Sequence, residues 1–418
     1  MNDAMIAKIR AFSPNARLYI LHVMGMDAIY GSWAVIFNLY LLAIGFSLPF
    51  IGMRILVGSL TEALASIPAG AISNLIGRQW SFILGDGVGA TMAIVSILTR
   101  NSWVLLTTAV VTGLFSALHS NAEPAFMAEN SRPDERIYLF SAASGFRTAS
   151  ATVGALVAGW VTLRFSHRVG PVTAYQDATI FGIALWFVSL VPAVLLKPSA
   201  TEQEIKKVAR GNSAAVWHHP TRIRRLATYA GLTSLSAGLI VPLFNVYFQR
   251  ALHLNALQIG GVFAIGGVVL TIATLFAPYL ESRLGTVRAV SRFRLAAVPF
   301  ILGLGLLPKL LHVVPLWAPL LVFYVSRHVL SNVVHPLASA FGMNILDPGE
   351  RSIATGSQTL AANVAWALAA YAGSLILHAK GYVWIFLASA VISLCAQGMY
   401  LRFFGALNPQ NHAQRLDA

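Results

Sequence analysis

A chain of 418 residues in which 57% are hydrophobic and only 11% are charged is too apolar for a soluble domain, where about a quarter of the residues carry charge. The 29 Lys and Arg residues outnumber the 15 Asp and Glu residues. In a soluble protein this excess would favour nucleic acid as a partner. Here we ascribe the excess to membrane topology and expect no nucleic acid as a partner. The only cysteine, Cys395, excludes an intramolecular disulfide and a cysteine-rich metal site.

Long apolar stretches recur along the whole chain and predict an all-α integral membrane protein. At roughly 30 to 35 residues for a helix and its loop, the length holds about twelve spans and no separate soluble domain. The polar N-terminus leads directly into the first span, so we expect no removable signal peptide. The predicted helices cover residues 16–44, 49–76, 79–99, 103–129, 135–163, 173–196, 223–251, 255–284, 287–311, 316–343, 351–379 and 382–404.

The basic residues are distributed unequally between the two sides of the membrane. With a cytoplasmic N-terminus, about twenty Lys and Arg residues, Arg294 among them, lie on the cytoplasmic side and about six on the other, as the positive-inside rule predicts. We therefore expect a multi-pass protein of a bacterial-type inner membrane, the plasma membrane of such a cell, with both termini cytoplasmic. We further expect a monomer.

The two halves of the chain resemble each other. Phe-Asn-Leu-Tyr at residues 37–40 recurs as Phe-Asn-Val-Tyr at 244–247, and the longest charged connection, 197–222, lies between the halves. These features predict an N-terminal six-helix bundle at 1–196, a cytoplasmic linker, and a C-terminal six-helix bundle with a short tail at 223–418. Many transporters build their binding site between two such repeats.

The turn after the second predicted helix carries a recognisable motif. Residues 68–79 resemble the cytoplasmic signature of the major facilitator superfamily, in which Gly70, Gly77 and Arg78 match. Asn74 stands where that signature has aspartate, which weakens the usual charge pairing. Glycine allows two helices to approach closely across a tight turn.

The corresponding turn of the second half keeps Arg283 and Gly285. Together with the duplication, this resemblance implies two pseudo-symmetric six-helix bundles, a gating role for both turns, and secondary active transport by alternating access. Asp86, near the first turn, is expected to contact the cytoplasmic loops between the bundles.

Ionisable residues inside spans are costly and therefore indicate function. Asp27, Glu62, His119 and Arg147 all lie about 10 to 14 residues from the cytoplasmic ends of their helices, which predicts that they converge on one cavity. We assign proton coupling to Asp27, Glu62 and Glu123, because a buried carboxyl group exchanges its proton when a nearby arginine moves. The alternative is a fixed salt bridge between Arg147 and one of these acids.

The second half places polar residues but no acid at mid-membrane. The spacing of His328, Asn332 and His335 puts them on one helix face, which is predicted to face the cavity. No acid or cysteine accompanies these histidines, so we expect no metal site and no cofactor. The predicted substrate-binding residues are Asn38, Tyr40, His119, Arg147, Asn245, Tyr247, Arg327, His328, Asn332, His335, Gln358 and Asn363. Hydrogen bonds between helices are the alternative for Asn38, Asn245 and His335.

A secondary transporter is the function that these features favour. The first specific hypothesis is proton-coupled export, by antiport, of a small hydrophobic or amphipathic compound. The alternatives are uptake or exchange of a small anionic metabolite held by Arg147 and Arg327, and a membrane sensor that does not transport. An enzyme is not expected, because neither a Gly-x-Ser-x-Gly nor a His-Glu-x-x-His motif occurs.

Overall fold

The computed structural model describes residues 12–132, 136–199, 219–274, 280, 283–310, 315–346 and 351–405, and these ranges contain helices but no strand. The first-half helices are α2 (Pro14–Ala43), α3 (Leu48–Ile76), α4 (Arg78–Leu98), α5 (Ser102–Glu129), α6 (Arg136–Val169) and α7 (Pro171–Val194). The second-half helices are α9 (Pro220–Ile240), the 3-10 turn η1 (Val241–Leu243), α10 (Phe244–Leu252), α11 (Ala256–Thr274), α13 (Thr286–Ala296), α14 (Val298–Leu310), α15 (Trp317–Asn332), α16 (His335–Asn344), α17 (Arg351–Lys380) and α18 (Tyr382–Phe404).

Every predicted span contains a helix, and ten helical segments of the described part are long and apolar enough to cross a membrane. The prediction of an all-α integral membrane protein is confirmed. Three second-half spans are interrupted, at η1, between α13 and α14, and between α15 and α16. Pro242, Pro299 and Pro336 lie at these breaks, because proline lacks the N–H that continues a helix.

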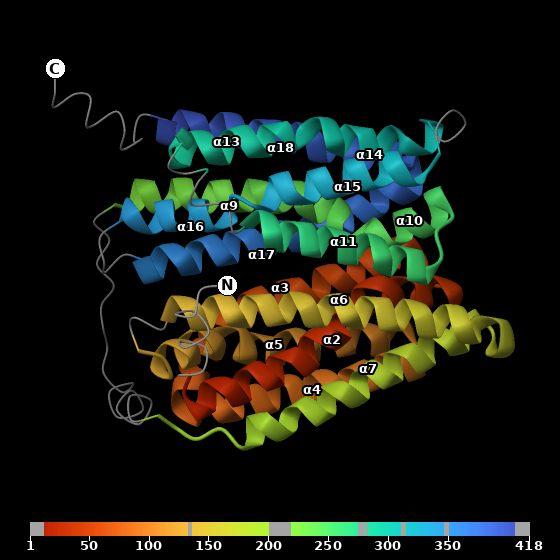
Figure 1. The fold of residues 1–418 in the computed structure, drawn as a ribbon, viewed down its shortest axis with the longest axis horizontal. Coiled ribbons are helices and arrows are strands. Elements are labelled where there is room, and N and C mark those ends of the chain that lie inside the picture. Colours follow the sequence, from red (N-terminus) through yellow and green to blue (C-terminus); the bar gives the residue numbers. More distant parts are fainter. Residues whose placement is uncertain are drawn as a thin grey trace. The chain divides into compact units, whose positions relative to one another are not determined.

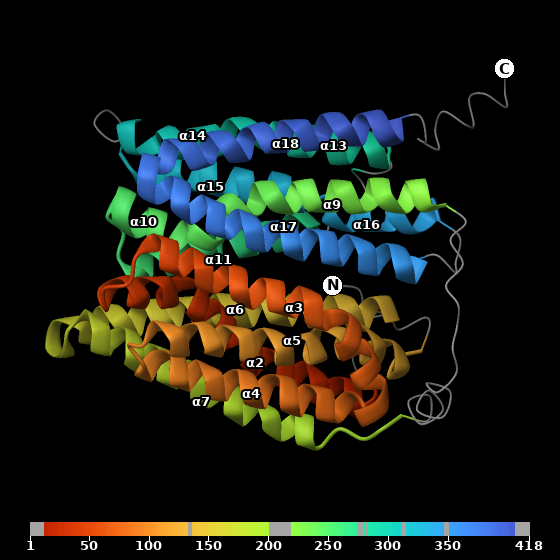
Figure 2. The ribbon, with the colours of Figure 1, turned by 180° about the vertical axis from the view of Figure 1, so that it is seen from behind.

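Contacts between Cα atoms group the described helices into two compact units. Unit 1 contains α2, α4, α5, α6 and α7, the part of α3 from residue 57 onwards, and α11 as far as residue 264. Unit 2 contains the first turns of α3, the rest of α11, and the other second-half helices (Figures 1 and 2). Most of the predicted linker, 200–218, lies outside the described residues, so the predicted domain boundaries stay a prediction.

Glycines bring the backbones of α2 and α6 together in unit 1. A Cβ atom on Gly31 would overlap the carbonyl group of Ala151, and one on Gly154 would overlap that of Ala28. Only glycine permits this approach, which is typical of helix packing in membranes. As a result, side chains of α2 and α6 meet directly, and charged groups of these two helices lie within reach of each other.

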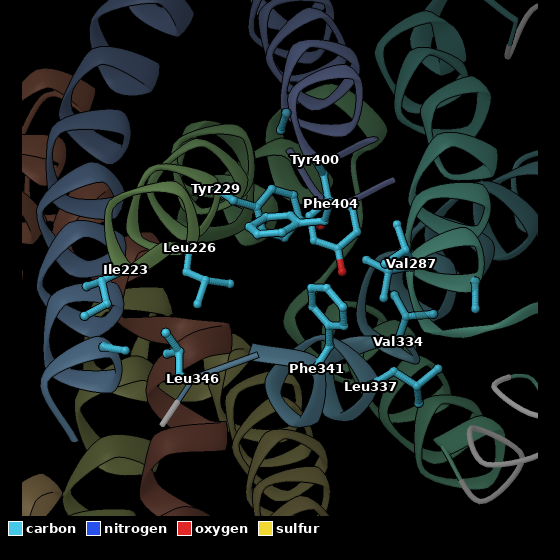
Figure 3. Packing of buried hydrophobic residues seen from close by; sticks show 14 of the residues in the cluster. Ile223, Leu226, Tyr229, Val287, Val334, Leu337, Phe341, Leu346, Tyr400 and Phe404 are labelled. Atoms are coloured by element: carbon cyan, nitrogen blue, oxygen red, sulfur yellow. The ribbon is translucent and has the colours of Figure 1, made fainter. Parts of the chain in front are cut away.

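Aromatic residues form much of the core of unit 2. The rings of Tyr229 and Tyr400 lie 4.3 Å apart between centroids, and those of Phe341 and Phe404 lie 5.5 Å apart. Figure 3 shows Tyr229, Tyr400 and Phe404 together, with Phe341 beside them. Because Tyr229 and Tyr400 also line a cavity, this core supports one wall of the polar space described below.

Candidate functional site

Unit 1 encloses a cavity of about 320 Å³ whose wall is unusually rich in charge. The helices α2, α3, α5 and α6 bring Asp27, Glu62, His119 and Arg147 to this cavity, as their similar depth predicted. The charged and titratable lining residues are Asp27, Glu62, Asp86, His119, Glu123 and Arg147. The lining thus contains more carboxyl groups than fixed positive charges.

Arg147 lies between two of these carboxylates. Its Nη2 atom donates to Oε2 of Glu123 at 2.7 Å, and its Nε atom lies 3.4 Å from Oδ2 of Asp27. The side chains of Arg147, Asp27 and Glu123 are 31%, 17% and 14% exposed, so water screens this ion-pair network only in part. One guanidinium group thus contacts two acids, so its own charge is compensated within unit 1 while the acids remain in excess.

Glu62 has a different environment. Its Oε1 atom accepts hydrogen bonds from the hydroxyl groups of Ser116 at 3.2 Å and Ser120 at 3.1 Å. No basic side chain forms an ion pair with Glu62 within the part of the chain that the structure describes. Hydroxyl groups accept as well as donate, so they can serve either protonation state of the carboxyl group.

Asp86, which we expected to contact the cytoplasmic loops, is bonded to side chains of α2 and α5 within the part of the chain that the structure describes. Asp86 is 2% exposed, and its Oδ2 atom lies 2.8 Å from both Nε2 of His22 and Nδ1 of His119. The cause is the close packing of α4 on α5: a Cβ atom on Gly85 would lie only 3.1 Å from Cβ of His119. The sequence analysis did not identify His22 as a site residue, because nothing in the sequence shows which side chain a single histidine in an apolar helix will contact.

Unit 2 encloses a second cavity, of about 400 Å³. It brings together the predicted residues Arg327, His328, Asn332, His335 and Gln358. Residues that the sequence interpretation did not assign to a site also line it, and they include Tyr229, Arg294, Trp366 and Gln397. No carboxylate occurs among its lining residues within the described ranges.

Arg327 is the principal charge of this second cavity. It is only 4% exposed, and within the described residues no hydrogen bond or ion pair reaches its guanidinium group. The guanidinium carbon lies 5.4 Å from the centre of the Phe244 ring, a cation–π contact that satisfies none of its N–H groups. Arg294, by contrast, donates from Nη1 to the hydroxyl group of Tyr229 at 2.7 Å.

Two tyrosines that were predicted to bind substrate donate hydrogen bonds to backbone carbonyl groups. Tyr40 donates its hydroxyl hydrogen to the carbonyl oxygen of Ile97 at 2.6 Å, and Tyr247 donates to that of Leu304. Neither tyrosine lines either cavity. In both halves of the repeat, the tyrosine hydroxyl group therefore forms a hydrogen bond with the backbone.

Three asparagines predicted to bind substrate also lie away from both cavities. Asn38 and Asn363 are half-buried and line neither, and Asn245 is buried with its Oδ1 atom accepting from the backbone N–H of Val246 at 2.9 Å. Helix packing places all three on faces that the cavities do not reach.

The signature turn retains a charge pair, formed with an acid that the motif does not contain. Arg78 is 5% exposed and contacts Oε1 of Glu129, at the end of α5, with Nη2 at 3.0 Å and Nε at 3.3 Å. Its Nη1 atom donates to the hydroxyl group of Ser73 at 3.0 Å. Charge pairing at this turn is thus present despite the asparagine at position 74, which is half-buried.

Gly77 and Gly285, in the two turns, adopt a backbone conformation that requires glycine. Gly77 has φ of 99° and Gly285 has φ of 72°, values that favour glycine over other residues. Gly70, in contrast, has ordinary space around it, with Asn121 Oδ1 3.9 Å from a notional Cβ. Arg283 is exposed. The two turns therefore share their glycine conformation, while the arginine is buried only in the first half.

Membrane-spanning helices with a polar cavity in each compact unit are typical of carriers. The family model described as "Major Facilitator Superfamily" matches residues 18–326, and the chain belongs to this superfamily of transporters. No curated protein sequence matches the chain.

Solved structures show the same fold. A crystal structure of the nucleoside transporter NupG covers 94% of this chain and 99% of its own, with a TM-score of 0.74 and 12% identity. A single-residue variant of NupG gives a TM-score of 0.74, 13% identity, and coverage of 94% and 100%. The human organic anion transporter MFSD10 gives a TM-score of 0.58, 18% identity, and coverage of 94% and 99%.

Proposed function

We propose that this protein is a proton-coupled secondary transporter of a small organic anion, which binds in the cavity of unit 2. One observation carries the proposal: Arg327 is buried at the cavity wall without a carboxylate or a hydrogen-bond acceptor among the described residues. An unpaired buried charge costs several kcal/mol. An anionic substrate supplies the missing partner, with up to two parallel hydrogen bonds to the guanidinium group.

The lining of this cavity favours the anion hypothesis over export of a hydrophobic compound. Arg327, Arg294, His328, Asn332 and Gln358 offer hydrogen-bond donors, and the volume of about 400 Å³ suits a small metabolite. Arg147, the other arginine considered for anion binding, is paired with two acids in unit 1. Arg327 is therefore the residue on which we expect affinity to depend.

The cavity of unit 1 supports proton coupling. Its acids exceed its fixed positive charges, and Glu62 forms only hydroxyl hydrogen bonds. Low-dielectric surroundings disfavour an unpaired carboxylate and favour its uptake of a proton. We assign the coupling proton to Glu62, and we assign to Asp27 the role of competing with Glu123 for Arg147.

The topology completes the proposal. The excess of basic residues on one side of the predicted spans supports cytoplasmic termini in a bacterial-type inner membrane. Each unit contains its own polar cavity among its own residues, which supports a monomer as the working form.

A transport assay in proteoliposomes tests this function. The purified chain is reconstituted with a pH-sensitive dye in the lumen, and a panel of labelled monocarboxylates, dicarboxylates and phosphate esters is added, with nucleosides and sugars as uncharged counterparts. We expect an anion to enter together with a change in lumenal pH. Arg327→Gln is expected to reduce this flux at least tenfold, whereas Arg224→Gln, on the exposed face of α9, leaves it unchanged. Transport of only uncharged compounds, at equal rates by the wild type and Arg327→Gln, would contradict the proposal.

A further inference from the structure

Three buried side chains from three helices of unit 1 meet at a single point. Nε2 of His22, Oδ2 of Asp86 and Nδ1 of His119 come from α2, α4 and α5, and one ligand atom of each lies within 4.8 Å of the other two. The residues are 0%, 2% and 6% exposed. Two imidazoles and one carboxylate are a common ligand set for Zn²⁺ and other divalent transition ions.

The groups behind these ligands have the arrangement that metal ligands need. Nδ1 of His22 lies 2.8 Å from the carbonyl oxygen of Ser189, which accepts only, so that nitrogen carries a hydrogen and Nε2 is the atom turned towards Asp86. Nε2 of His119 faces Oε2 of Glu123 at 3.8 Å and the hydroxyl group of Tyr19 at 3.4 Å. A second ring nitrogen held by a carbonyl or a carboxylate orients a histidine for metal binding.

The spacing of the ligand atoms requires only small adjustments. Both nitrogens lie 2.8 Å from Oδ2 of Asp86, whereas tetrahedral ligands at about 2.0 to 2.1 Å from a Zn²⁺ ion are separated by about 3.3 Å, so each nitrogen must move away from Oδ2 by about half an ångström. Asp86 and His119 line the cavity of about 320 Å³, which gives an ion a route to the cluster. The surplus of carboxyl groups around that cavity attracts a cation.

We propose that His22, Asp86 and His119 bind one resident divalent transition ion, for which Zn²⁺ is the best fit, and that the ion cross-links α2, α4 and α5. Binding displaces the hydrogen that His22 shares with Asp86, so that at least one proton leaves through the cavity. His119 then holds its ring hydrogen on Nε2, towards Glu123 and Tyr19. The ion is separate from the transported anion, and Arg327 plays no part in holding it.

Metal content measured without any transport substrate tests this proposal. The full chain, purified with an affinity tag free of histidine, is stripped with a chelator, incubated with Zn²⁺, passed through gel filtration and analysed for zinc by mass spectrometry. We expect about one ion per chain in the wild type and at least a tenfold lower content in His22→Gln and Asp86→Asn at the same free Zn²⁺. His167→Gln, which removes an exposed histidine of α6, keeps the wild-type content.

Two further readouts separate ion binding from folding. Zn²⁺ raises the melting temperature of the wild type and of His167→Gln but not that of Asp86→Asn, and Co²⁺ bound to the wild type gives a visible absorption band that Zn²⁺ abolishes. If the wild type retains no more zinc than Asp86→Asn and shows no cobalt band, the cluster is only hydrogen-bonded and the proposal fails. This outcome does not bear on the anion proposal, because that proposal is tested by comparing anion flux in the wild type and in Arg327→Gln.

Discussion

Tyr247 donates its hydroxyl hydrogen to the carbonyl oxygen of Leu304, which has no helical partner because the residue four positions later is Pro308. The first half contains the equivalent bond: Tyr40 donates to the carbonyl oxygen of Ile97, in the last turn of α4. In both halves the two residues are 57 positions apart. The repeat thus preserves a tyrosine whose hydroxyl group donates to a backbone carbonyl group near the end of the third predicted helix of each half.

Removing these hydroxyl groups is expected to have unequal effects. Tyr247→Phe leaves the buried Leu304 carbonyl without its donor, which costs about 1–3 kcal/mol. In Tyr40→Phe the Ile97 carbonyl still accepts from Nε2 of Gln176 at 2.8 Å, so the cost stays below about 1 kcal/mol. Thermal unfolding in detergent measures both, and adding Gln176→Leu to Tyr40→Phe is expected to raise the cost. Equal losses for the two single variants would refute this assignment.

Two glycines of α4 form a matched pair for testing the contact with α5. A Cβ atom on Gly85 would lie 3.0 Å from the carbonyl oxygen of Phe115 and 3.1 Å from Cβ of His119, whereas one on Gly87 would meet only Leu190 Cδ1 at 3.7 Å. Gly85→Ala is therefore expected to destabilise the protein by about 1–3 kcal/mol. Gly87→Ala is expected to be neutral or stabilising, because alanine is the better helix former. The check is the melting temperature of each variant, and a larger loss for Gly87→Ala argues against the packing described.

The ion pair of Arg147 and Glu123 predicts a coupling energy. Removing either partner leaves buried charge in the cavity of unit 1, where Asp27 lies 3.4 Å from Arg147. Since Arg147 is about one third exposed, we expect a coupling energy of about 1–2 kcal/mol rather than the larger value of a fully buried pair. A double-mutant cycle with Arg147→Gln and Glu123→Gln measures it by unfolding. Strict additivity of the two single effects would show that the pair does not interact.

Glu62→Gln is expected to separate anion movement from proton movement. The glutamine keeps hydrogen bonds with Ser116 and Ser120 but binds no exchangeable proton, so the change in lumenal pH that accompanies anion flux should fall at least tenfold. Exchange of labelled for unlabelled anion at equal pH persists, because the cavity of unit 2 is unaltered. Asp177→Asn, at an exposed position of α7, serves as the control. Full proton movement in Glu62→Gln would remove Glu62 from the coupling mechanism.

Several site residues could be placed from the sequence because helical geometry is regular. His328 and Asn332 lie one turn apart on α15, His335 begins α16 just beyond the break, and all three line the cavity of unit 2 as their spacing predicted. Depth along the helices likewise predicted that Asp27, Glu62, His119 and Arg147 share a cavity. Within an unbroken helix, a count of residues was sufficient to predict these positions.

Several contacts were missed because the two partners lie on different helices. His22 meets Asp86 across 64 positions, Arg78 meets Glu129 across 51, and Arg294 meets Tyr229 across 65. Nothing in the sequence around these residues indicates which helix faces pack together. Arg294 therefore counted only as a cytoplasmic charge, although it lines a cavity.

The sequence by itself determined that this chain is a membrane protein of duplicated helices and that it belongs among transporters, since apolar length and repeated motifs are properties of consecutive residues. Only the tertiary structure decided which ionisable groups neutralise one another and which are left over. Arg147 and Arg327 look alike as isolated arginines within helices, yet the first contacts two carboxylates and the second has none among the described residues. The difference arises because a charge in a low-dielectric interior is governed by neighbours a few ångströms away in space, and helix packing brings those neighbours from distant parts of the chain.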